Sequence, residues 1–556
     1  MRVEDIEGMT VGGLLELVTE RRPDEDALIY PDRNLRYTYR EFDAAVDDCA
    51  RALISLGVKK GDHVAVWGQN VPEWVTLQFA TGKTGAVLVT INPAYKAHEL
   101  KYVLEQSDAA ALFLTTGVKD SDFLEILRSA VPETDKPDDL SSPELPFLKN
   151  VVLIGDTPPQ DTMILSFEEF LRRGEDVSEN ALMERRESLS AEDVINMQYT
   201  SGTTGFPKGV RLTHENIVKN AFQIGECMKL GPEDRVCIPV PFFHCFGCVL
   251  GTLNTVTHEA TMVPVEVFDP LSVLRAVHEE RCTAVLGVPT MFIAELDHPD
   301  FKEYDTSSLR TGIMAGSPCP MEVMKKVVDV MGADEITIAY GQTESSPVIT
   351  QTRTDDPLEL RVSTVGRALP DVEVRIVSVE SGEDCEADEQ GELWTRGYHV
   401  MHGYYKMDEK TSEVIDEDGW LHTGDLAEMD ADGYIKITGR AKDMIIRGGE
   451  NIYPREIEEF LYTHPEISDV QVYGVPDERY GEKVAAAVIK REGSELTAET
   501  VQDYCRENIA RYKVPDYVDF VDGYPMTASG KIQKYKLRET AVDLYGLQEA
   551  AEVETA

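Results

Sequence analysis

A stretch rich in glycine, serine and threonine, YTSGTTGFPKGV, occupies residues 199–210 and contains one lysine. Glycines let a chain turn its backbone N–H groups toward an anion, so this stretch could bind phosphate. The Walker A pattern G-x-x-x-x-G-K-[ST] does not fit it. Counted from Gly202, the second glycine position holds Pro207, and Gly209 follows Lys208 where Ser or Thr is required. The stretch therefore predicts a phosphate loop of another class and disfavours a kinase or GTPase of the Walker A type.

The length and composition are those of a folded protein with several structural units. The chain has 556 residues, of which 42% are hydrophobic. This length predicts two to four units, and the hydrophobic content argues against disorder of the whole chain. No run approaches 18 apolar residues, and the acidic N-terminus lacks the basic and apolar regions of a secretory signal. We therefore expect a cytoplasmic protein without a membrane span.

The charge is strongly acidic. There are 101 Asp and Glu residues against 54 Lys and Arg residues, which gives a formal net charge of −47, and the acids are spread along the chain. Such a surface repels nucleic acid and anionic membranes, so neither is expected as a partner. Two interpretations stay open: a preference for basic partners, and a halophilic adaptation in which high intracellular salt screens the self-repulsion. The short blocks of like charge favour the adaptation to salt.

Nine cysteines, an odd number spread along the chain, argue against a disulfide framework. Cys245 and Cys248 form a C-x-x-C motif beside His244. As a metal site the motif lacks a second pair at zinc-finger spacing. As a redox motif it lacks an evident helix start. Buried pocket or core cysteines are the favoured interpretation, and whether they touch a substrate stays open.

Short apolar runs alternate with amphipathic segments from about residue 60 onward. Buried strands are predicted at residues 63–68, 85–91, 110–116, 234–242, 282–289, 311–317 and 335–341. Helices are predicted at 269–280 and 319–332, and a polar surface insertion at 132–146. This alternation is typical of an α/β fold with layered, mostly parallel sheets.

The pattern changes after Asp425. Residues 433–454 are strand-like and then glycine-rich, and the helix that follows has Pro454 in its first turn. Further strand patterns and a helix near 497–508 complete a compact α+β unit of about 110 residues, a typical small-domain size. We expect three parts: a large α/β N-terminal domain at 1–439, a hinge at 440–443, and a small mobile α+β C-terminal domain at 444–556.

Five separated segments together resemble the adenylate-forming superfamily, which includes acyl-CoA synthetases, firefly luciferase and peptide-synthetase adenylation domains. They are the loop at 199–210, YGQTE (340–344), HTGDL (422–426), GRAKDMIIRGGENIYPREIE (439–458) and PMTASGKIQKYKLR (525–538). They occur in the family's order and cover the chain from about residue 30 to residue 538. Residues 439–538 look most like the fatty acyl-CoA synthetase branch, particularly its medium-chain members.

The resemblance implies two half-reactions. A carboxylate attacks the α-phosphate of ATP, which releases pyrophosphate and leaves an acyl-adenylate. The thiol of coenzyme A then attacks this mixed anhydride, which releases AMP and a thioester. Fixed donors and a cation at the phosphates would stabilise the spread negative charge. ATP, Mg²⁺ and coenzyme A are thus the expected cofactors and co-substrates, and a small carboxylic acid is the expected partner.

The resemblance implies that the first loop is a β/γ-phosphate cradle, which is mobile because pyrophosphate must leave. Its backbone amides, hydroxyls and one ammonium would bind the phosphates. The residues concerned are Thr200, Ser201, Gly202, Thr203, Thr204, Gly205 and Lys208.

YGQTE follows a predicted strand end, where ligands of open α/β sheets bind. The resemblance implies that Thr343 contacts the α-phosphate and that Glu344 holds Mg²⁺, a hard cation suited to carboxylate and nucleotide oxygens. It also implies that Tyr340 stacks near adenine, together with the backbone at Gly316 and Ser317.

Further contacts are implied near the domain boundary. Asp425 matches the family's ribose ligand, since a carboxylate can accept hydrogen bonds from both ribose hydroxyls. Arg440 matches a second nucleotide contact, and Lys442 falls at the hinge position. Gly448 and Gly449 would line the passage of the pantetheine arm.

Lys531 in ASGKIQK corresponds to the lysine that bridges the carboxylate and the α-phosphate during adenylation. An ammonium between two anions lowers their repulsion and stabilises developing charge. Lys534, three residues on, is expected to be a solvated helix charge. His244 in PFFHCFG lies beside the family's carboxylate pocket and is a further catalytic candidate, with a core histidine as the alternative.

Two features bear on the substrate. Amino-acid-activating domains place an Asp in the segment that here reads PFFHCFG, which has no acid, and only 25 residues follow Lys531, so no carrier domain is expected. Both favour a free carboxylic acid and soluble coenzyme A. We therefore predict an AMP-forming acyl-CoA synthetase, an acid–thiol ligase, for a fatty acid, with medium chains favoured.

Two alternatives stay open. One is an aryl-CoA ligase of the coumarate or benzoate type. The other is a non-catalytic ligand-binding member of the fold, against which the intact Lys531, Glu344, Asp425 and Arg440 speak. A luciferase-like oxidation has no positive support. Acyl chain length, pathway and oligomeric state, a homodimer included, stay open.

Overall fold

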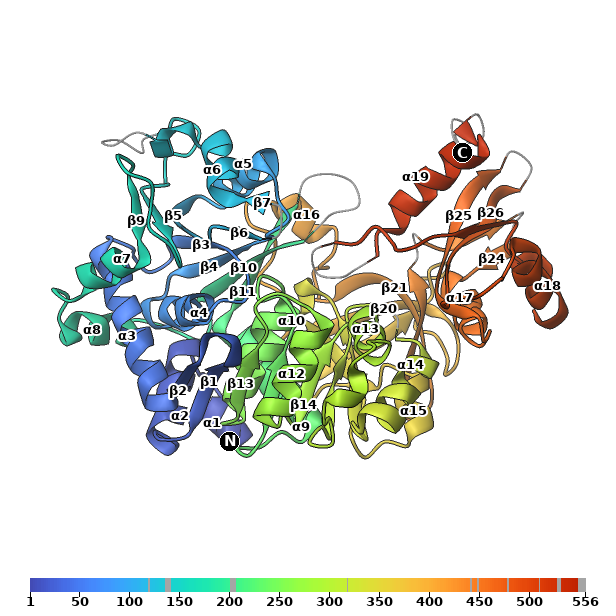
Figure 1. Ribbon diagram of the computed structural model, residues 1–556, viewed down its shortest axis with the longest axis horizontal. Helices are drawn as coiled ribbons and strands as arrows, with labels where there is room; N and C mark the ends of the chain where they lie inside the picture. Colours follow the sequence, from blue (N-terminus) through green and yellow to red (C-terminus); the bar gives the residue numbers. More distant parts are fainter. Residues whose placement is uncertain are drawn as a thin grey trace.

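The computed structural model describes residues 1–118, 121–135, 142–200, 207–317, 319–440, 443–447, 450–477, 480–509, 511–527 and 532–548. Two large sheets with helices packed around them make up most of the chain, and a smaller unit with its own sheet follows at the C-terminal end (Figure 1). This architecture confirms the predicted α/β fold with a smaller α+β domain.

Within the described residues, the first large sheet has the strand order β11-β10-β4-β3-β5-β8-β9. Its strands are β3 (His63–Trp67), β4 (Val87–Ile91), β5 (Ala109–Leu114), β8 (Asn150–Leu153), β9 (Ile164–Ser166), β10 (Val194–Thr200) and β11 (Lys208–Thr213). Neighbours pair in parallel except β10 and β11, which form an antiparallel hairpin. Every residue of β4 is buried, as expected for a parallel strand covered on both faces. The predicted strands at 63–68, 85–91 and 110–116 are confirmed.

The second large sheet of the described chain has the order β18-β17-β16-β15-β14-β12-β13-β1-β2. Its strands are β1 (Asp26–Tyr30), β2 (Leu35–Thr38), β12 (Arg235–Ile238), β13 (Thr261–Pro264), β14 (Ala284–Gly287), β15 (Thr311–Met314), β16 (Glu335–Gly341), β17 (Val348–Gln351) and β18 (Arg367–Ala368). The interior pairs are parallel and the edge pairs antiparallel. The strand predicted at 234–242 ends early, at Ile238, because Pro239 has no N–H group to continue the ladder.

Helices pack around these sheets, and their ends follow local sequence signals. At α3, the Thr38 N–H donates to Glu41 Oε2 (2.9 Å) and the Glu41 N–H donates to Thr38 Oγ1 (3.3 Å), which forms a capping box. The main helices are α2 (Val11–Arg21), α3 (Tyr39–Ser55), α4 (Pro72–Thr84), α5 (Ala97–Gln106), α6 (Phe123–Ala130), α7 (Phe167–Gly174), α8 (Glu179–Glu187), α9 (His214–Met228), α12 (Pro270–Glu280), α13 (Pro289–Leu296), α14 (Met321–Lys326) and α15 (Leu358–Ser363). The helix predicted at 319–332 is α14, continued by a π-helical turn at Val327–Met331.

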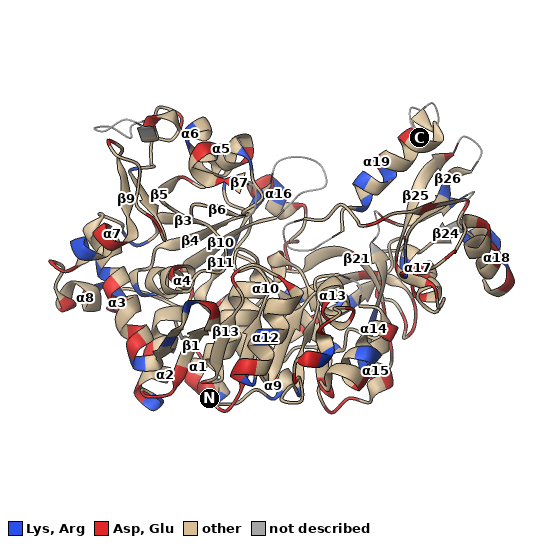
Figure 2. Ribbon diagram, in the orientation of Figure 1, with Lys and Arg blue, Asp and Glu red and all other residues tan. Residues whose placement is uncertain are grey.

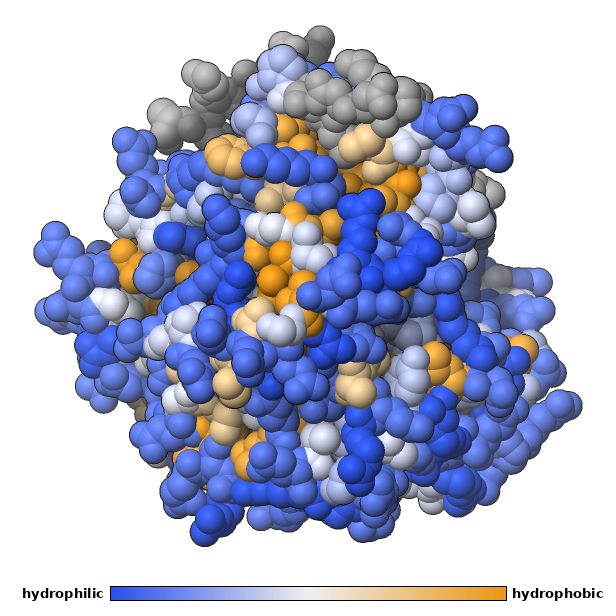
Figure 3. Space-filling model, turned by 90° about the vertical axis from the view of Figure 1, so that its left-hand side faces the viewer, coloured by the Kyte–Doolittle hydropathy of each residue, from blue (hydrophilic) through white to orange (hydrophobic). Residues whose placement is uncertain are grey.

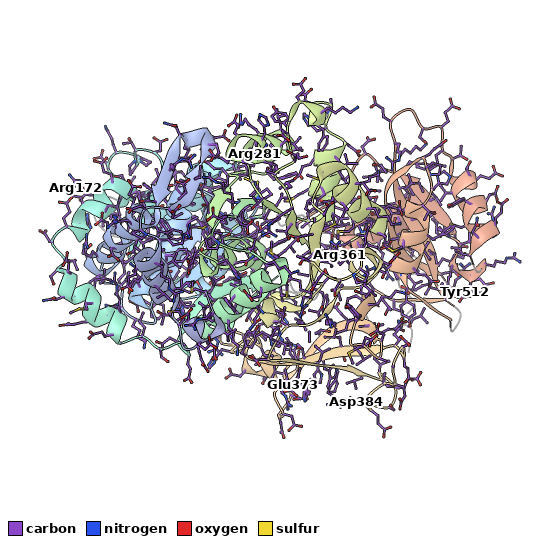
Figure 4. The ribbon with its side chains drawn as sticks, turned by 90° about the horizontal axis from the view of Figure 1, so that it is seen from below. Arg172, Arg281, Arg361, Glu373, Asp384 and Tyr512 are labelled. Atoms are coloured by element: carbon purple, nitrogen blue, oxygen red, sulfur yellow. The ribbon has the colours of Figure 1, made fainter. Side chains whose placement is uncertain are left out.

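A four-stranded antiparallel sheet, which the sequence analysis did not predict, precedes the small unit. It contains β19 (Val372–Val377), β20 (Gly391–Gly397), β21 (Leu421–Met429) and β22 (Ile435–Arg440) of the described chain. Glu373 and Asp384 lie at its rim (Figure 4), where Glu373 pairs with Arg396 and Asp384 with Arg375. The predicted hinge at 440–443 begins where β22 ends, and the domain boundary stays a prediction.

The small unit has the strand order β24-β23-β26-β25, with β27 beside β26, in the part of it that is described. Its elements are β23 (Ile445–Arg447), β24 (Glu450–Ile452), α17 (Pro454–Tyr462), β25 (Ile467–Asp477), β26 (Gly481–Lys490), α18 (Ala498–Asn508), β27 (Tyr517–Phe520) and α19 (Lys534–Tyr545). Arg455 of α17 donates from Nη1 to the Ile437 carbonyl oxygen of β22 (2.9 Å), which joins the unit to the preceding sheet.

Acidic residues occur on helices throughout the molecule, in both the large and the small part (Figure 2). Hydrophilic residues cover most of the face shown in Figure 3, and hydrophobic residues form limited patches between them. Among the described helices, none is both long and apolar enough to cross a bilayer.

Glu295 of α13 is a carboxyl group buried in the large domain. It is 1% exposed, and within the described chain its Oε2 has no hydrogen-bond partner. Burial raises the pKa of Glu295 from 4.5 to about 8. Between these values the folded state binds more protons than the unfolded state, so the free energy of unfolding falls as pH rises, by up to about 1.4 kcal/mol per pH unit.

Glu295→Gln is therefore expected to flatten the pH dependence of stability between about pH 5 and pH 8, because the neutral amide has no proton to lose. Urea unfolding at a series of pH values measures this slope. Glu322→Gln is the matched control, since Glu322 on the neighbouring α14 is solvent-exposed and pairs with Lys325. An unchanged slope in Glu295→Gln would contradict the expected ionisation.

Candidate functional site

The base of the predicted phosphate loop is a hairpin between β10 and β11. Thr200 ends β10, Lys208 begins β11, and the two residues are register partners. The Lys208 Nζ lies 4.4 Å from the centroid of the Tyr404 ring. The rest of the predicted cradle lies outside the described residues: Ser201, Gly202, Thr203, Thr204 and Gly205.

The segment 401–405 connects this hairpin to the YGQTE motif. The Tyr405 N–H donates to the Gly209 carbonyl oxygen of β11 (2.8 Å), and the Met401 N–H donates to the Glu344 carbonyl oxygen (2.9 Å). The Tyr404 hydroxyl donates to Glu344 Oε1 (2.8 Å). Lys208 and Glu344, predicted from separate motifs, are thus brought to the same place.

YGQTE begins within β16 and continues into a short 3-10 turn at Thr343–Ser345. Thr343 is 6% exposed. The Tyr340 hydroxyl donates to Asp425 Oδ2 (2.7 Å), so the predicted adenine and ribose contacts lie side by side. Asp425 on β21 is the register partner of Arg440 on β22. The backbone of Arg440, the other predicted nucleotide contact near the domain boundary, therefore lies next to that of Asp425.

Gly316 follows β15, one strand away from β16. Its φ of +86° is in the left-handed region, and a Cβ there would meet Val288 Cγ1 at 3.1 Å and Phe246 Cδ1 at 3.8 Å. Ser317 is the next residue. The carboxyl ends of β14, β15 and β16 therefore converge on this site, as expected for ligand sites of open parallel sheets. His244, two residues before Phe246, accepts the Phe246 N–H at its Nδ1 (3.2 Å) and so caps a short helical turn.

The two cysteines of the C-x-x-C motif are core residues, as the favoured interpretation predicts. Cys245 donates to Gln198 Oε1, and Gln198 Nε2 donates to Cys248 Sγ, both at 2.9 Å. Burial raises the pKa of Cys248 to about 12, so its thiol stays neutral. All nine cysteines lie in described residues; each is a free thiol, and Cys385 alone is not fully buried. The described residues contain no group of three or more potential metal ligands of the His, Cys, Asp and Glu types.

The expectation that Lys534 is a solvated charge is wrong. Its Nζ lies 2.5 Å from Glu458 Oε1 and donates to the Val472 carbonyl oxygen (2.9 Å). Glu458 is only 5% exposed in its side chain, and its Oε1 also accepts the Val472 N–H (2.7 Å). The helix α19 packs on β25, and this packing brings the ammonium to a buried carboxylate.

Besides the five loop residues, four further predicted site residues lie outside the described part of the chain: Lys442, Gly448, Gly449 and Lys531. Described residues that flank Lys531 in the sequence contact each other. Met526 and Ile532 form an antiparallel bridge, and the Gln533 N–H donates to the Pro525 carbonyl oxygen (2.8 Å).

Sequence reasoning missed two residues that the structure places at these motifs, Tyr404 and Glu458. Tyr404 belongs to a glycine-tyrosine-tyrosine triplet, a visible signal, but its partner Glu344 is 60 residues away. Glu458 lies at the end of the 439–458 motif, in a helix. A charged residue in a helix is typically predicted to be exposed to solvent. Neither contact follows from local spacing.

Comparisons with known proteins agree with this geometry. The chain matches the family described as AMP-binding enzyme over residues 15–405 and the AMP-binding enzyme C-terminal domain over residues 456–531. The chain therefore belongs to the AMP-binding enzyme family, which confirms the predicted membership of the adenylate-forming superfamily.

Relatives match nearly the whole chain. The "Putative acyl-CoA synthetase YngI" of Bacillus subtilis (strain 168) is 56% identical over 540 residues, which are 97% of this chain and 98% of that protein. The mitochondrial medium-chain acyl-CoA ligase ACSF2 of Danio rerio is 43% identical over 98% of this chain and 90% of its own length. The crystal structure of the anthranilate CoA ligase AuaEII with anthranoyl-AMP has a TM-score of 0.86 at 29% identity, over 98% of this chain and all of that one.

Proposed function

We propose that this protein is an AMP-forming acyl-CoA synthetase that activates a fatty acid, with medium chains favoured, through an acyl-adenylate. The observation that carries the proposal is the convergence of Lys208, Glu344, Tyr340 and Asp425, which come from three separate motifs, at one end of the parallel sheets. The names of the relatives YngI and ACSF2 support the same reaction, and the name of ACSF2 supports a medium-chain substrate.

In this proposal the nucleotide lies across the ends of β15 and β16. Tyr340 and the backbone at Gly316 would contact adenine. A carboxylate offers about four lone-pair sites, so Asp425 can keep its Tyr340 hydrogen bond and still accept from ribose hydroxyls. Lys208 would supply positive charge at the phosphates, and Thr343 a hydroxyl at the α-phosphate.

Glu344 fits the proposed Mg²⁺ by its chemistry. It is a half-buried carboxylate whose Oε1 accepts from Tyr404, while Oε2 accepts no hydrogen bond from a described residue. Carboxylate oxygens are preferred ligands of hard cations. When bound, Mg²⁺ would neutralise phosphate charge, and Glu344 would orient it from the protein side.

An aryl-CoA ligase is the second candidate, because AuaEII is a close structural neighbour. The acid-free segment PFFHCFG suits either an aliphatic or an aromatic carboxylic acid. Coenzyme A is the proposed acceptor in both cases.

The test is AMP release from ATP with coenzyme A and a panel of acids from acetate through octanoate and palmitate to benzoate and coumarate. AMP and acyl-CoA formed together with octanoate as the best acid would support the proposal. Benzoate or coumarate as the best acid would favour the aryl-CoA ligase. No AMP with any acid, in low salt or molar KCl, would favour a ligand-binding protein without catalysis.

We also propose that the acidic surface is a halophilic adaptation. Screening of a net charge of −47 lowers self-repulsion. The midpoint temperature of unfolding is therefore expected to rise by several degrees between dilute buffer and about 2 M KCl. Thermal unfolding followed by circular dichroism measures the shift. A midpoint independent of KCl would count against the adaptation.

A further inference from the structure

Tyr404 touches both charged groups that the proposed nucleotide site places around the phosphates. It is 2% exposed, its hydroxyl donates to Glu344 Oε1 (2.8 Å), and the Lys208 Nζ lies 4.4 Å from its ring centroid. A tyrosine hydroxyl both donates and accepts hydrogen bonds, and here it donates to the carboxylate.

The backbone around Tyr404 fixes this arrangement from both sides. The Arg211 N–H of β11 donates to the Gly403 carbonyl oxygen (3.1 Å), and the His402 N–H donates back to the Arg211 carbonyl oxygen (2.9 Å). The Met401 N–H is bonded to the Glu344 carbonyl oxygen. The segment 401–405 thus sets the separation between the phosphate-loop hairpin and the turn that carries Glu344.

Tyr404 contacts an ammonium with its ring face and a carboxylate with its hydroxyl, two groups whose charges attract each other. Among the described residues, Lys208 forms no ion pair, and its contact with the electron-rich face of Tyr404 holds it without neutralising it. Glu344 is held by a neutral hydroxyl instead of a cation. Both charges therefore stay available for other groups.

We infer that Tyr404 is a positioning residue for a nucleoside triphosphate with its divalent cation. Its hydroxyl orients the Glu344 carboxylate toward the cation, and its ring keeps Lys208 apart from Glu344 and directed to the phosphates. This inference rests on the proposed nucleotide site and names a residue of that site outside the five motifs.

The test compares the dissociation constants of ATP in the presence and in the absence of Mg²⁺. Isothermal titration calorimetry measures both constants without any turnover of substrate. Tyr404→Phe removes only the hydroxyl, so binding of ATP with Mg²⁺ is expected to weaken about tenfold, whereas binding of ATP alone stays unchanged. Tyr404→Leu also removes the aromatic ring and is expected to weaken both. Thermal unfolding of the variants verifies that each is folded.

Tyr405→Phe is the matched control. Tyr405 is the next residue and also donates to a carboxylate, Asp108 Oδ2 (2.9 Å), away from Glu344. It is expected to bind ATP with Mg²⁺ like the unmodified protein. A loss in Tyr405→Phe equal to that in Tyr404→Phe, or no loss in Tyr404→Phe, would overturn the inference.

A double-mutant cycle keeps the test decisive if a variant is destabilised. In a Glu344→Gln background, Tyr404→Phe is expected to have no further effect on the Mg²⁺ dependence, because the group that it orients has lost its charge. Additive effects would overturn the inference while leaving the proposed function in place. If the unmodified protein binds no ATP under either condition, the proposed function itself fails and the inference falls with it.

Discussion

Lys531→Ala is expected to lower the rate of acyl-adenylate formation by a factor on the order of 10²–10³, the usual effect of removing one donor that stabilises developing charge. In the proposed reaction the Lys531 ammonium lies between the attacking carboxylate and the α-phosphate. Thioester formation from supplied acyl-adenylate does not pass through that step, so it should stay largely intact. Pyrophosphate release measures the first half-reaction and acyl-CoA formation the second.

The control for Lys531→Ala is a lysine of the described helix α19, which follows Lys531 in the chain. Met526 and Ile532, which flank Lys531 in the sequence, form an antiparallel bridge, and the Gln533 N–H donates to the Pro525 carbonyl oxygen. Lys536→Ala, on the exposed surface of α19, should leave both half-reactions unchanged. An equal loss of both half-reactions in Lys531→Ala would mean that the assigned role is wrong.

Lys534→Met is expected to destabilise the small domain by about 3–5 kcal/mol, the usual cost of leaving a buried charge without its partner. The side chain of Glu458 is 5% exposed, and Lys534 is the cation that pairs with it. The variant should also slow acyl-adenylate formation, because the Lys534–Glu458 pair holds the start of α19, three residues after Lys531 in the sequence. Urea unfolding gives the stability change and pyrophosphate release the rate.

Arg538→Met on the same helix is the matched control. Arg538 pairs with Glu482, and the Arg538 side chain is 47% exposed, so its loss should cost about 1 kcal/mol or less. Glu458→Gln in the Lys534→Met background removes the unpaired charge and should recover much of the lost stability. Similar small losses in Lys534→Met and Arg538→Met would show that the buried pair does not anchor the domain.

The parallel strands could be predicted because strands that are buried on both faces consist of consecutive apolar residues. VLVTI of β4 is apolar or β-branched at every position and buried at every position. The four-stranded sheet could not be predicted in the same way. In β19, VEVRIV, charged Glu373 and Arg375 alternate with valines, and the strand lies with one side toward solvent. Pro239, which has no N–H group, is the local signal that the strand predicted at 234–242 ends early.

The motifs placed the candidate site, whereas the contacts that hold its residues depend on distant parts of the chain. Lys534 and Glu458 are 76 residues apart, and Tyr404 lies between two motifs that the sequence separates widely. A solvated charge and a buried ion pair have the same residue type and the same helical spacing. Only the packing of α19 against β25 distinguishes them.

The distribution of thiols allows the folded protein to be labelled chemically at one cysteine. Cys385 is the single cysteine that is not fully buried, and it lies between β19 and β20 on the sheet that precedes the small domain. Burial raises the pKa of the Cys385 thiol, so a maleimide would react slowly but at one position. A fluorophore attached there would sit on the large part of the molecule, and its energy transfer to a second dye on the small domain would report their separation through each half-reaction.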